Sequence, residues 1–204
     1  ESIMEDAIGS QISDYLIKPV NPNQILLSLK KNLDSKRLVS EKTTTGYQQE
    51  FRQIGMRLND RLDWSDWKEL YGEIVNWDLA LQKSGDPSMS EILHMQKEEA
   101  NNQFARFIED NYTDWLHHDS DDRPMMSHRL LKDWVFPHLS KEKPLFLVVI
   151  DNLRLDQWKT IEKVIREDFR IDQEEMFCSI LPTATQYARN ALFAGLLPSE
   201  IQKR

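Results

Sequence analysis

Residues 145–158 read LFLVVIDNLRLDQW and decide the fold class of the last third of the chain. The apolar run 145–150 has the length and β-branched content of a central strand that is covered on both faces. Apolar residues at helical spacing then predict a helix that begins near Leu155. A second strand over 176–181 and a second helix over 185–194 follow. This order of strands and helices predicts a parallel α/β sheet.

The middle of the chain, about residues 36–140, is predicted to be helical. Apolar residues recur at helical spacing in three long segments. A break predicted at 43–46 (TTTG) precedes the first segment, and a break predicted at 84–87 (SGDP) ends the second. A shorter helix is expected over 127–139, with Ser127 as its N-cap. Long amphipathic segments joined by short breaks predict an antiparallel helical bundle.

The N-terminal region carries the signals of one strand and one helix. The run 13–20 (SDYLIKPV) has the length of a buried strand. Asn21 and Pro22 then predict the start of a helix, with Asn as N-cap and Pro in the first turn. The chain opens on Glu1 in what reads as a helix already under way, so we expect an internal fragment of a longer protein.

Composition excludes several classes of protein. The net charge of −8 argues against a nucleic-acid coat or a binder of anionic membranes. A nucleotide substrate stays open, because a metal site supplies its own positive charge. The single cysteine, Cys178, excludes an intrachain disulfide framework and favours the cytoplasm. No apolar stretch approaches the roughly 20 residues of a membrane span, so no membrane insertion is expected.

Two residues are candidates for chemistry. Asp151 comes directly after a predicted buried strand, where open α/β sheets bind ligands, and its carboxylate suits a divalent cation. Thr185 comes at a predicted helix start, where metal coordination could turn its hydroxyl into a nucleophile. Taken singly, each residue is more often a helix cap, and Thr183 competes with Thr185 for that role.

The segment 145–158, followed by LPTATQYARNALFAGLLP (181–198), resembles the start of a PglZ domain, a branch of the alkaline phosphatase superfamily. The resemblance implies a metal-dependent phosphodiesterase or phosphatase with two zinc ions. It places Asp151 as a metal ligand and Thr185 as both nucleophile and metal ligand. Asn152 stands where the family usually has glycine, and asparagine also accepts left-handed backbone geometry. The remaining ligands are expected beyond this chain.

The motif DYLIKP, residues 14–19, resembles the last strand of a CheY-like receiver domain. The resemblance implies that Lys18 reaches a phosphoaspartate and that Tyr15 swings inward on activation. A cation there would stabilise the added phosphoryl charge. The phosphoacceptor aspartate and the ligands of a receiver magnesium ion are expected outside this chain. The alternative is a lysine that snorkels at a strand end.

The order of these two motifs, with a helical insert between them, resembles the PorX type of response regulator. That type is associated with type IX (Por) protein secretion. The expected fold class is multidomain α/β: the C-terminal part of a doubly wound receiver (1–34), an α-helical bundle (35–140) and the start of an alkaline-phosphatase-like α/β domain (141–204). The resemblance implies a sensor histidine kinase, a phosphorylation-dependent homodimer, a transcription regulator or secretion component as partner, and a nucleotide or oligonucleotide substrate. The alternative is a non-catalytic PglZ-like scaffold that signals through protein contacts.

Three conspicuous features are interpreted as structural. A polar loop is interpreted as solvated rather than as a metal cluster, because loop ligands lack support from neighbouring groups: His117, His118, Asp119, Asp121 and Asp122. Tryptophans at helical spacing are interpreted as core residues rather than base-stacking platforms: Trp64, Trp67, Trp77 and Trp115. Cap or surface positions are expected for His128 and His138.

Overall fold

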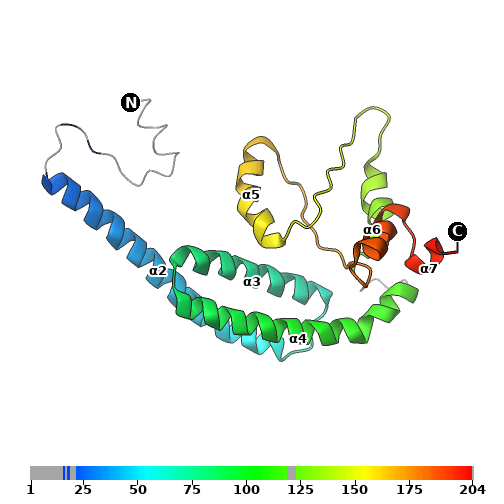
Figure 1. Cartoon of the computed structure of the whole chain (residues 1–204), viewed down its shortest axis with the longest axis horizontal. Coiled ribbons are helices and arrows are strands. Elements are labelled where there is room, and N and C mark those ends of the chain that lie inside the picture. The colour runs from blue at the N-terminus through cyan, green and yellow to red at the C-terminus, as the bar shows by residue number, and fades with distance from the viewer. Residues whose placement is uncertain (1–15, 17, 19–21, 119–122, 204) are drawn as a thin grey trace. The chain divides into compact units, whose positions relative to one another are not determined.

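The computed structural model describes residues 16, 18, 22–118 and 123–203 (Figure 1). The helices are α2 (Pro22–Leu58), α3 (Trp64–Ser84), α4 (Pro87–His117), α5 (Leu155–Asp168), α6 (Thr185–Ala194) and α7 (Pro198–Ile201). Three short helical turns precede α5: η1 (Ser127–Arg129), η2 (Leu131–Val135) and η3 (Phe136–His138). The described chain forms two compact units. One contains residues up to 60 with 76–98, and the other contains 61–75 with 99–204.

The first unit has a buried polar contact at its centre. Tyr47 of α2 is fully buried, and its hydroxyl donates a 3.1 Å hydrogen bond to Oε1 of Gln96 on α4. Nε2 of Gln96 donates in turn to the carbonyl of Phe51 at 3.0 Å. The Tyr47 ring also packs on Trp77 of α3, with centroids 5.5 Å apart. The buried hydroxyl and amide therefore satisfy each other within this unit.

The break predicted at residues 43–46 is wrong, because α2 continues through it. Thr43 directs its hydroxyl to the carbonyl of Val39 at 2.9 Å and so remains compatible with the helix. Gly46 lies against Trp77, and a Cβ at this position would come within 3.1 Å of the indole ring. The glycine thus serves close packing between helices rather than a chain break.

The break predicted between α3 and α4 is confirmed. Gly85 ends α3 in the left-handed region at φ 71°, where glycine carries no steric penalty. Asp86 then caps α4, since its Oδ1 accepts hydrogen bonds from the backbone N–H groups of Ser88 and Met89 at 3.0 and 3.3 Å. Pro87 occupies the first helical position, where its missing N–H costs nothing.

The second unit is built around aromatic side chains of α3 and α4. Trp67 packs edge-on against Phe104 with ring centroids 5.2 Å apart, and Trp115 packs against Phe107 at 5.4 Å. Trp64 adds a further edge contact to Trp115 at 6.1 Å. Trp67 and Trp115 are both buried. The interpretation as core residues is confirmed for Trp67 and Trp115, whereas Trp64 and Trp77 are half-buried.

The strand predicted over 145–150 is wrong for the described chain. These residues form no strand and stay exposed, with Phe146 84% exposed. The run 176–181 does not form a strand either, and its β-structure is a single parallel bridge between Met126 and Cys178. A strand needs a neighbour for its backbone hydrogen bonds, and among the described residues none pairs with 145–150.

The helices predicted after these runs are confirmed. A helix was expected near Leu155, and α5 begins there. The second was expected over 185–194, and α6 has these bounds. Gly195 ends α6 with φ 67°, and Pro198 opens α7. Local capping and periodicity therefore predicted the helical parts of this segment correctly.

The helix predicted over 127–139 is replaced by the turns η1, η2 and η3. Ser127 is not an N-cap, because Met126 holds that position without any side-chain hydrogen bond. The Ser127 hydroxyl instead accepts a 3.0 Å hydrogen bond from the backbone N–H of Ile180, and Ser127 is buried. The Ser127 hydroxyl thus binds the backbone near Cys178 instead of capping its own helical turn.

The receiver expectations fall mostly outside the described residues. Tyr15 is not described, whereas Lys18 is described and exposed. An α/β receiver is therefore not seen in the described residues, and the three domain boundaries stay predictions.

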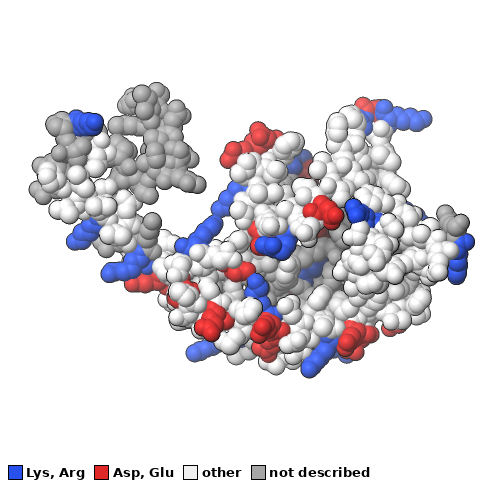
Figure 2. Space-filling model, viewed as in Figure 1, with Lys and Arg blue, Asp and Glu red and all other residues white. Residues whose placement is uncertain are grey.

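On the face drawn in Figure 2, acidic and basic side chains of the described residues are interspersed. Within the described chain, no helix has both the length and the apolarity to cross a membrane.

Candidate functional site

Asp151 follows the extended segment 145–150 and begins a turn. Asn152 takes the left-handed conformation at φ 62°. This agrees with the glycine that the family usually has at this position, since both residues accept left-handed geometry. The N-cap of α5 is Arg154, whose backbone N–H donates to Oε1 of Gln157 at 3.0 Å. Asp151 is therefore not the cap of α5, and its carboxylate is 81% exposed.

Thr185 is the first residue of α6, and it is exposed. The N-cap of α6 is Ala184, which makes no side-chain hydrogen bond. Neither Thr183 nor Thr185 thus caps the helix, and the capping alternative is wrong for both threonines. The Thr185 hydroxyl lies at the positive end of α6, where backbone N–H groups favour negative charge.

An ion pair connects the Asp151 turn to α6. Nη1 of Arg189 lies 4.0 Å from Oδ2 of Asp151. Arg189 stands four residues after Thr185, and residues at this spacing share one face of a helix. The Asp151 carboxylate is therefore within ion-pair distance of a side chain of α6 that stands one helical turn after Thr185. Sequence reasoning missed Arg189, although its spacing from Thr185 was a signal that could have identified it.

The donor chemistry of Asp151 and Thr185 suits a divalent cation, since both offer oxygen ligands. They are fewer than the three or four protein ligands that zinc takes. Within residues 22–118 and 123–203, no group of three His, Cys, Asp or Glu could hold a metal. The two residues fit part of a zinc site, and additional ligands would be needed to complete it.

Among the described residues, the other polar features singled out in the sequence form no metal cluster. His118 pairs weakly with Asp114 at 3.9 Å. Asp119, Asp121 and Asp122 lie outside the described residues, so the interpretation of this loop as solvated stays a prediction. His138 is exposed, as expected. His128 differs from expectation because its Nδ1 is buried without a hydrogen-bond partner in the described residues. Burial lowers the pKa of His128, against an opposing effect of the nearby acidic residues.

Cys178 is unsuited to nucleophilic chemistry. Its thiol is buried, and burial raises the pKa of this thiol to about 11. The thiolate, which is the reactive form, is therefore scarce at neutral pH. Cys178 belongs to a buried cluster with Trp115, Met126, Ile180 and Ala191. This cluster underlies α6 and fixes the helix that carries Thr185.

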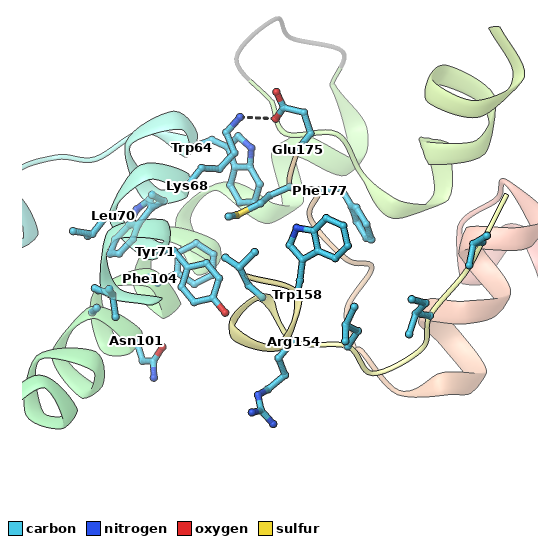
Figure 3. A pocket seen from close by; sticks show the side chains of 18 residues that line it. Trp64, Lys68, Leu70, Tyr71, Asn101, Phe104, Arg154, Trp158, Glu175 and Phe177 are labelled. Atoms are coloured by element: carbon cyan, nitrogen blue, oxygen red, sulfur yellow. Dashed lines mark hydrogen bonds and ion pairs between the residues drawn. The ribbon is translucent and has the colours of Figure 1, made fainter. Parts of the chain in front are cut away.

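A separate cavity of about 770 Å³ lies in the second unit (Figure 3). Aromatic side chains supply much of its lining, with Trp64, Tyr71, Phe104, Trp158 and Phe177 among them. At its edge, Nζ of Lys68 lies 3.0 Å from Oε2 of Glu175. Neither Asp151 nor Thr185 lines this cavity. The cavity thus marks where α3 and α4 contact residues of the last third of the chain.

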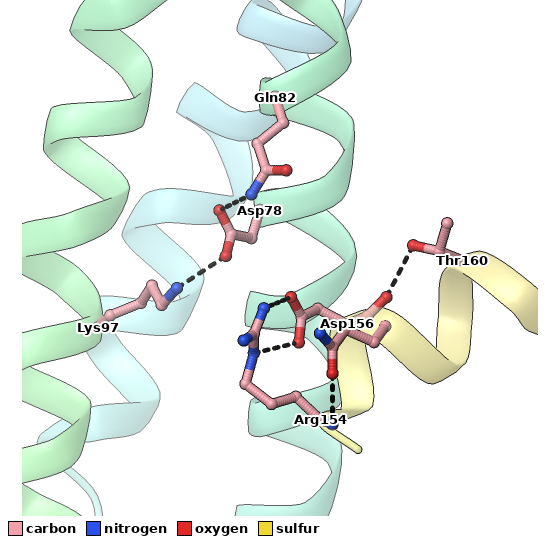
Figure 4. A network of polar contacts seen from close by, with 7 residues as sticks. Asp78, Gln82, Lys97, Arg154, Asp156 and Thr160 are labelled. Atoms are coloured by element: carbon pink, nitrogen blue, oxygen red, sulfur yellow. Dashed lines mark hydrogen bonds and ion pairs between the residues drawn. The ribbon is translucent and has the colours of Figure 1, made fainter. Parts of the chain in front are cut away.

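The start of α5 is held by a bidentate ion pair (Figure 4). Two guanidinium nitrogens of Arg154 donate to the two carboxylate oxygens of Asp156 at 3.0 and 2.8 Å. The hydrogen bonds from Arg154 lower the pKa of Asp156. Thr160 adds a bond to the carbonyl of Asp156 at 2.8 Å. These contacts stabilise the first turn of α5, next to the Asp151 turn.

Two protein families match the chain. Residues 37–116 match the PorX response regulator linker domain. Residues 130–204 match the BREX system PglZ alkaline phosphatase-like domain. No curated protein matches the chain. Because a PorX linker domain is followed by a PglZ domain in a single chain, the protein belongs to the PorX type of response regulator.

Proposed function

We propose that this response regulator is a metal-dependent phosphodiesterase in which Thr185 is the nucleophile and Asp151 is a metal ligand. The ion pair between Asp151 and Arg189 supports the proposal most, because Arg189 stands one helical turn after Thr185 on α6. Neither Asp151 nor Thr185 is engaged as a helix cap. Both side chains are exposed and accessible to a substrate. The match to an alkaline phosphatase-like domain supports the same chemistry.

The Thr185 hydroxyl would attack phosphorus in line with the leaving alcohol. The new Oγ–phosphorus bond forms as the phosphorus–alcohol bond breaks, and water then cleaves the phosphothreonine. Arg189 and the N-terminus of α6 would stabilise negative charge on the phosphoryl oxygens. A zinc ion held by Asp151, Thr185 and further ligands would supply positive charge and lower the pKa of the hydroxyl.

The regulatory part of the proposal concerns the receiver. Phosphorylation by a sensor histidine kinase would rearrange Lys18 and Tyr15 and favour a homodimer. The linker helices would carry this change to the PglZ domain. We place the protein in the cytoplasm, in control of type IX secretion, with a nucleotide or oligonucleotide as substrate. A receiver magnesium ion and two zinc ions complete the proposed cofactors.

The test compares Thr185→Ala with Thr183→Ala in the full-length protein. Thr183 is an exposed threonine of the same turn, so it matches the substitution without the proposed role. With a chromogenic phosphate bis-ester, Thr185→Ala should lower kcat about 1000-fold or more, because it removes the nucleophile. Thr183→Ala should stay close to wild type.

Bound zinc, measured on the same samples, separates the enzyme from a scaffold. A zinc-containing wild type that turns over the ester supports the proposal. Equal turnover by wild type and Thr185→Ala would exclude Thr185 as nucleophile. A zinc-free wild-type protein without turnover would favour the scaffold that acts through protein contacts.

A further inference from the structure

The backbone that leads to Thr185 is held by hydrogen bonds from another part of the chain. The N–H of Cys178 donates to the carbonyl of Met125, and the N–H of Ser127 donates to the carbonyl of Cys178, both at 2.8 Å. The N–H of Ile180 donates to the Ser127 hydroxyl at 3.0 Å. These bonds fix residues 178–180 against residues 125–127.

The next backbone N–H is held by the linker domain itself. Leu181 donates its N–H to the hydroxyl of Tyr112 at 2.7 Å. Tyr112 lies on α4, inside the segment that matches the PorX linker. Only residues 182–184 separate Leu181 from Thr185. The linker hydroxyl thus holds the chain directly ahead of the turn that presents the nucleophile.

Packing reinforces this single hydrogen bond. Tyr112 and Trp115 stand three residues apart on α4, a spacing that places them on one helix face. Tyr112 packs against the buried cluster that includes Ile180 and, from α6, Ala191. Burial raises the pKa of Tyr112, against the opposing effect of the hydrogen bond from Leu181. A displacement of α4 would therefore be transmitted to the start of α6.

We propose that Tyr112 is a positioning residue for Thr185, through which the linker helix α4 controls the reactivity of the nucleophile. The inference rests on the proposed role of Thr185 in phosphodiester cleavage. Reacting atoms must be held closely in line, and a misplacement of about 1 Å can cost about 100-fold in rate. Tyr112 need not touch the substrate, since it acts on the backbone that carries Thr185.

The experiment uses Tyr112→Phe in the full-length protein, because phenylalanine keeps the ring and removes only the hydroxyl. Tyr47→Phe is the matched control, since it also removes a tyrosine hydroxyl that makes a hydrogen bond, the one to Gln96. Tyr112→Phe should lower kcat about 10-fold to 100-fold, with KM changed less than about 2-fold. Tyr47→Phe should leave both constants unchanged.

Amide hydrogen exchange across residues 181–188 provides a readout that does not need activity. Tyr112→Phe should accelerate exchange there about 10-fold or more, whereas Tyr47→Phe should not. Unchanged exchange would overturn the inference, whatever the turnover. Faster exchange with unchanged kcat would also overturn it, because the contact would then be structural only. If the wild type shows no turnover, the proposed function fails, and exchange alone decides whether Tyr112 positions Thr185.

Discussion

The linker helices and the PglZ segment differ in where their backbone hydrogen bonds are made. In α2, α3 and α4 each interior N–H finds its acceptor four residues earlier in the same helix. The extended backbone of residues 145–150 would need a neighbouring strand to make its hydrogen bonds. Sequence patterns therefore predict the helices from their own residues, whereas the strands depend on residues far away in the chain.

The same difference separates the two predicted strands. Ile180, in the second run, is 1% exposed because Ser127 and the cluster under α6 surround it. Phe146, in the first run, stays largely exposed. Both residues are apolar and lie in β-rich runs, so the sequence alone does not distinguish them. Neighbours from other parts of the chain decide which side chain is buried.

Substitution of these two residues should give the largest effect. Ile180→Ala should lower the free energy of unfolding by about 2–5 kcal/mol, because it opens a cavity in a packed cluster. Phe146→Ala should change it by less than about 0.5 kcal/mol, because little burial is lost. Urea unfolding of residues 1–204, followed by tryptophan fluorescence, measures both. Comparable losses would mean that 145–150 is packed in solution and would contradict the comparison.

A smaller effect on stability is expected from the buried phenol of Tyr47 in the first unit. Burial raises the pKa of the Tyr47 phenol to about 12, above its ordinary value near 10. The unfolded chain therefore loses this proton first. The stabilising contribution is complete below pH 10 and is lost as the pH rises from 10 to 12.

The expected loss is about 1–3 kcal/mol over this pH range, and Tyr47→Phe should remove that part of the dependence. Urea midpoints of both proteins at pH 9 and pH 11.5 measure it. Tyr187→Phe is the control, because Tyr187 is exposed. If wild type and Tyr47→Phe lose the same stability between these pH values, the buried phenol does not titrate as the structure implies.

Local signals account for what could be predicted from the sequence. Asp86, Gly85 and Gly195 act on their own helix ends, so their roles were readable without tertiary contacts. Gly46 was misread as a break because its partner, Trp77, lies on another helix. Contacts over such distances leave no periodic trace in the sequence.

The candidate site shows the same division. Asp151 and Thr185 were identified through a family resemblance that couples two motifs, not through spacing alone. Arg189 could have been found from its place one helical turn after Thr185. Tyr112 could not, because its partner is the backbone N–H of Leu181, 69 residues away. Every residue except proline has a backbone N–H, so no sequence pattern can identify the one that Tyr112 binds.

The smallest effect concerns the turn at Asn152, where local geometry and the candidate site meet. At φ 62°, a residue with a Cβ and no side-chain hydrogen bonding is disfavoured, so Asn152→Ala should cost about 1 kcal/mol. Asn152→Gly should stay within about 0.5 kcal/mol, because easier left-handed geometry is offset by the greater freedom of the unfolded chain. Urea unfolding measures both variants. A neutral Asn152→Ala would show that the turn is not left-handed, and the presentation of Asp151 toward Arg189 would then lack its backbone basis.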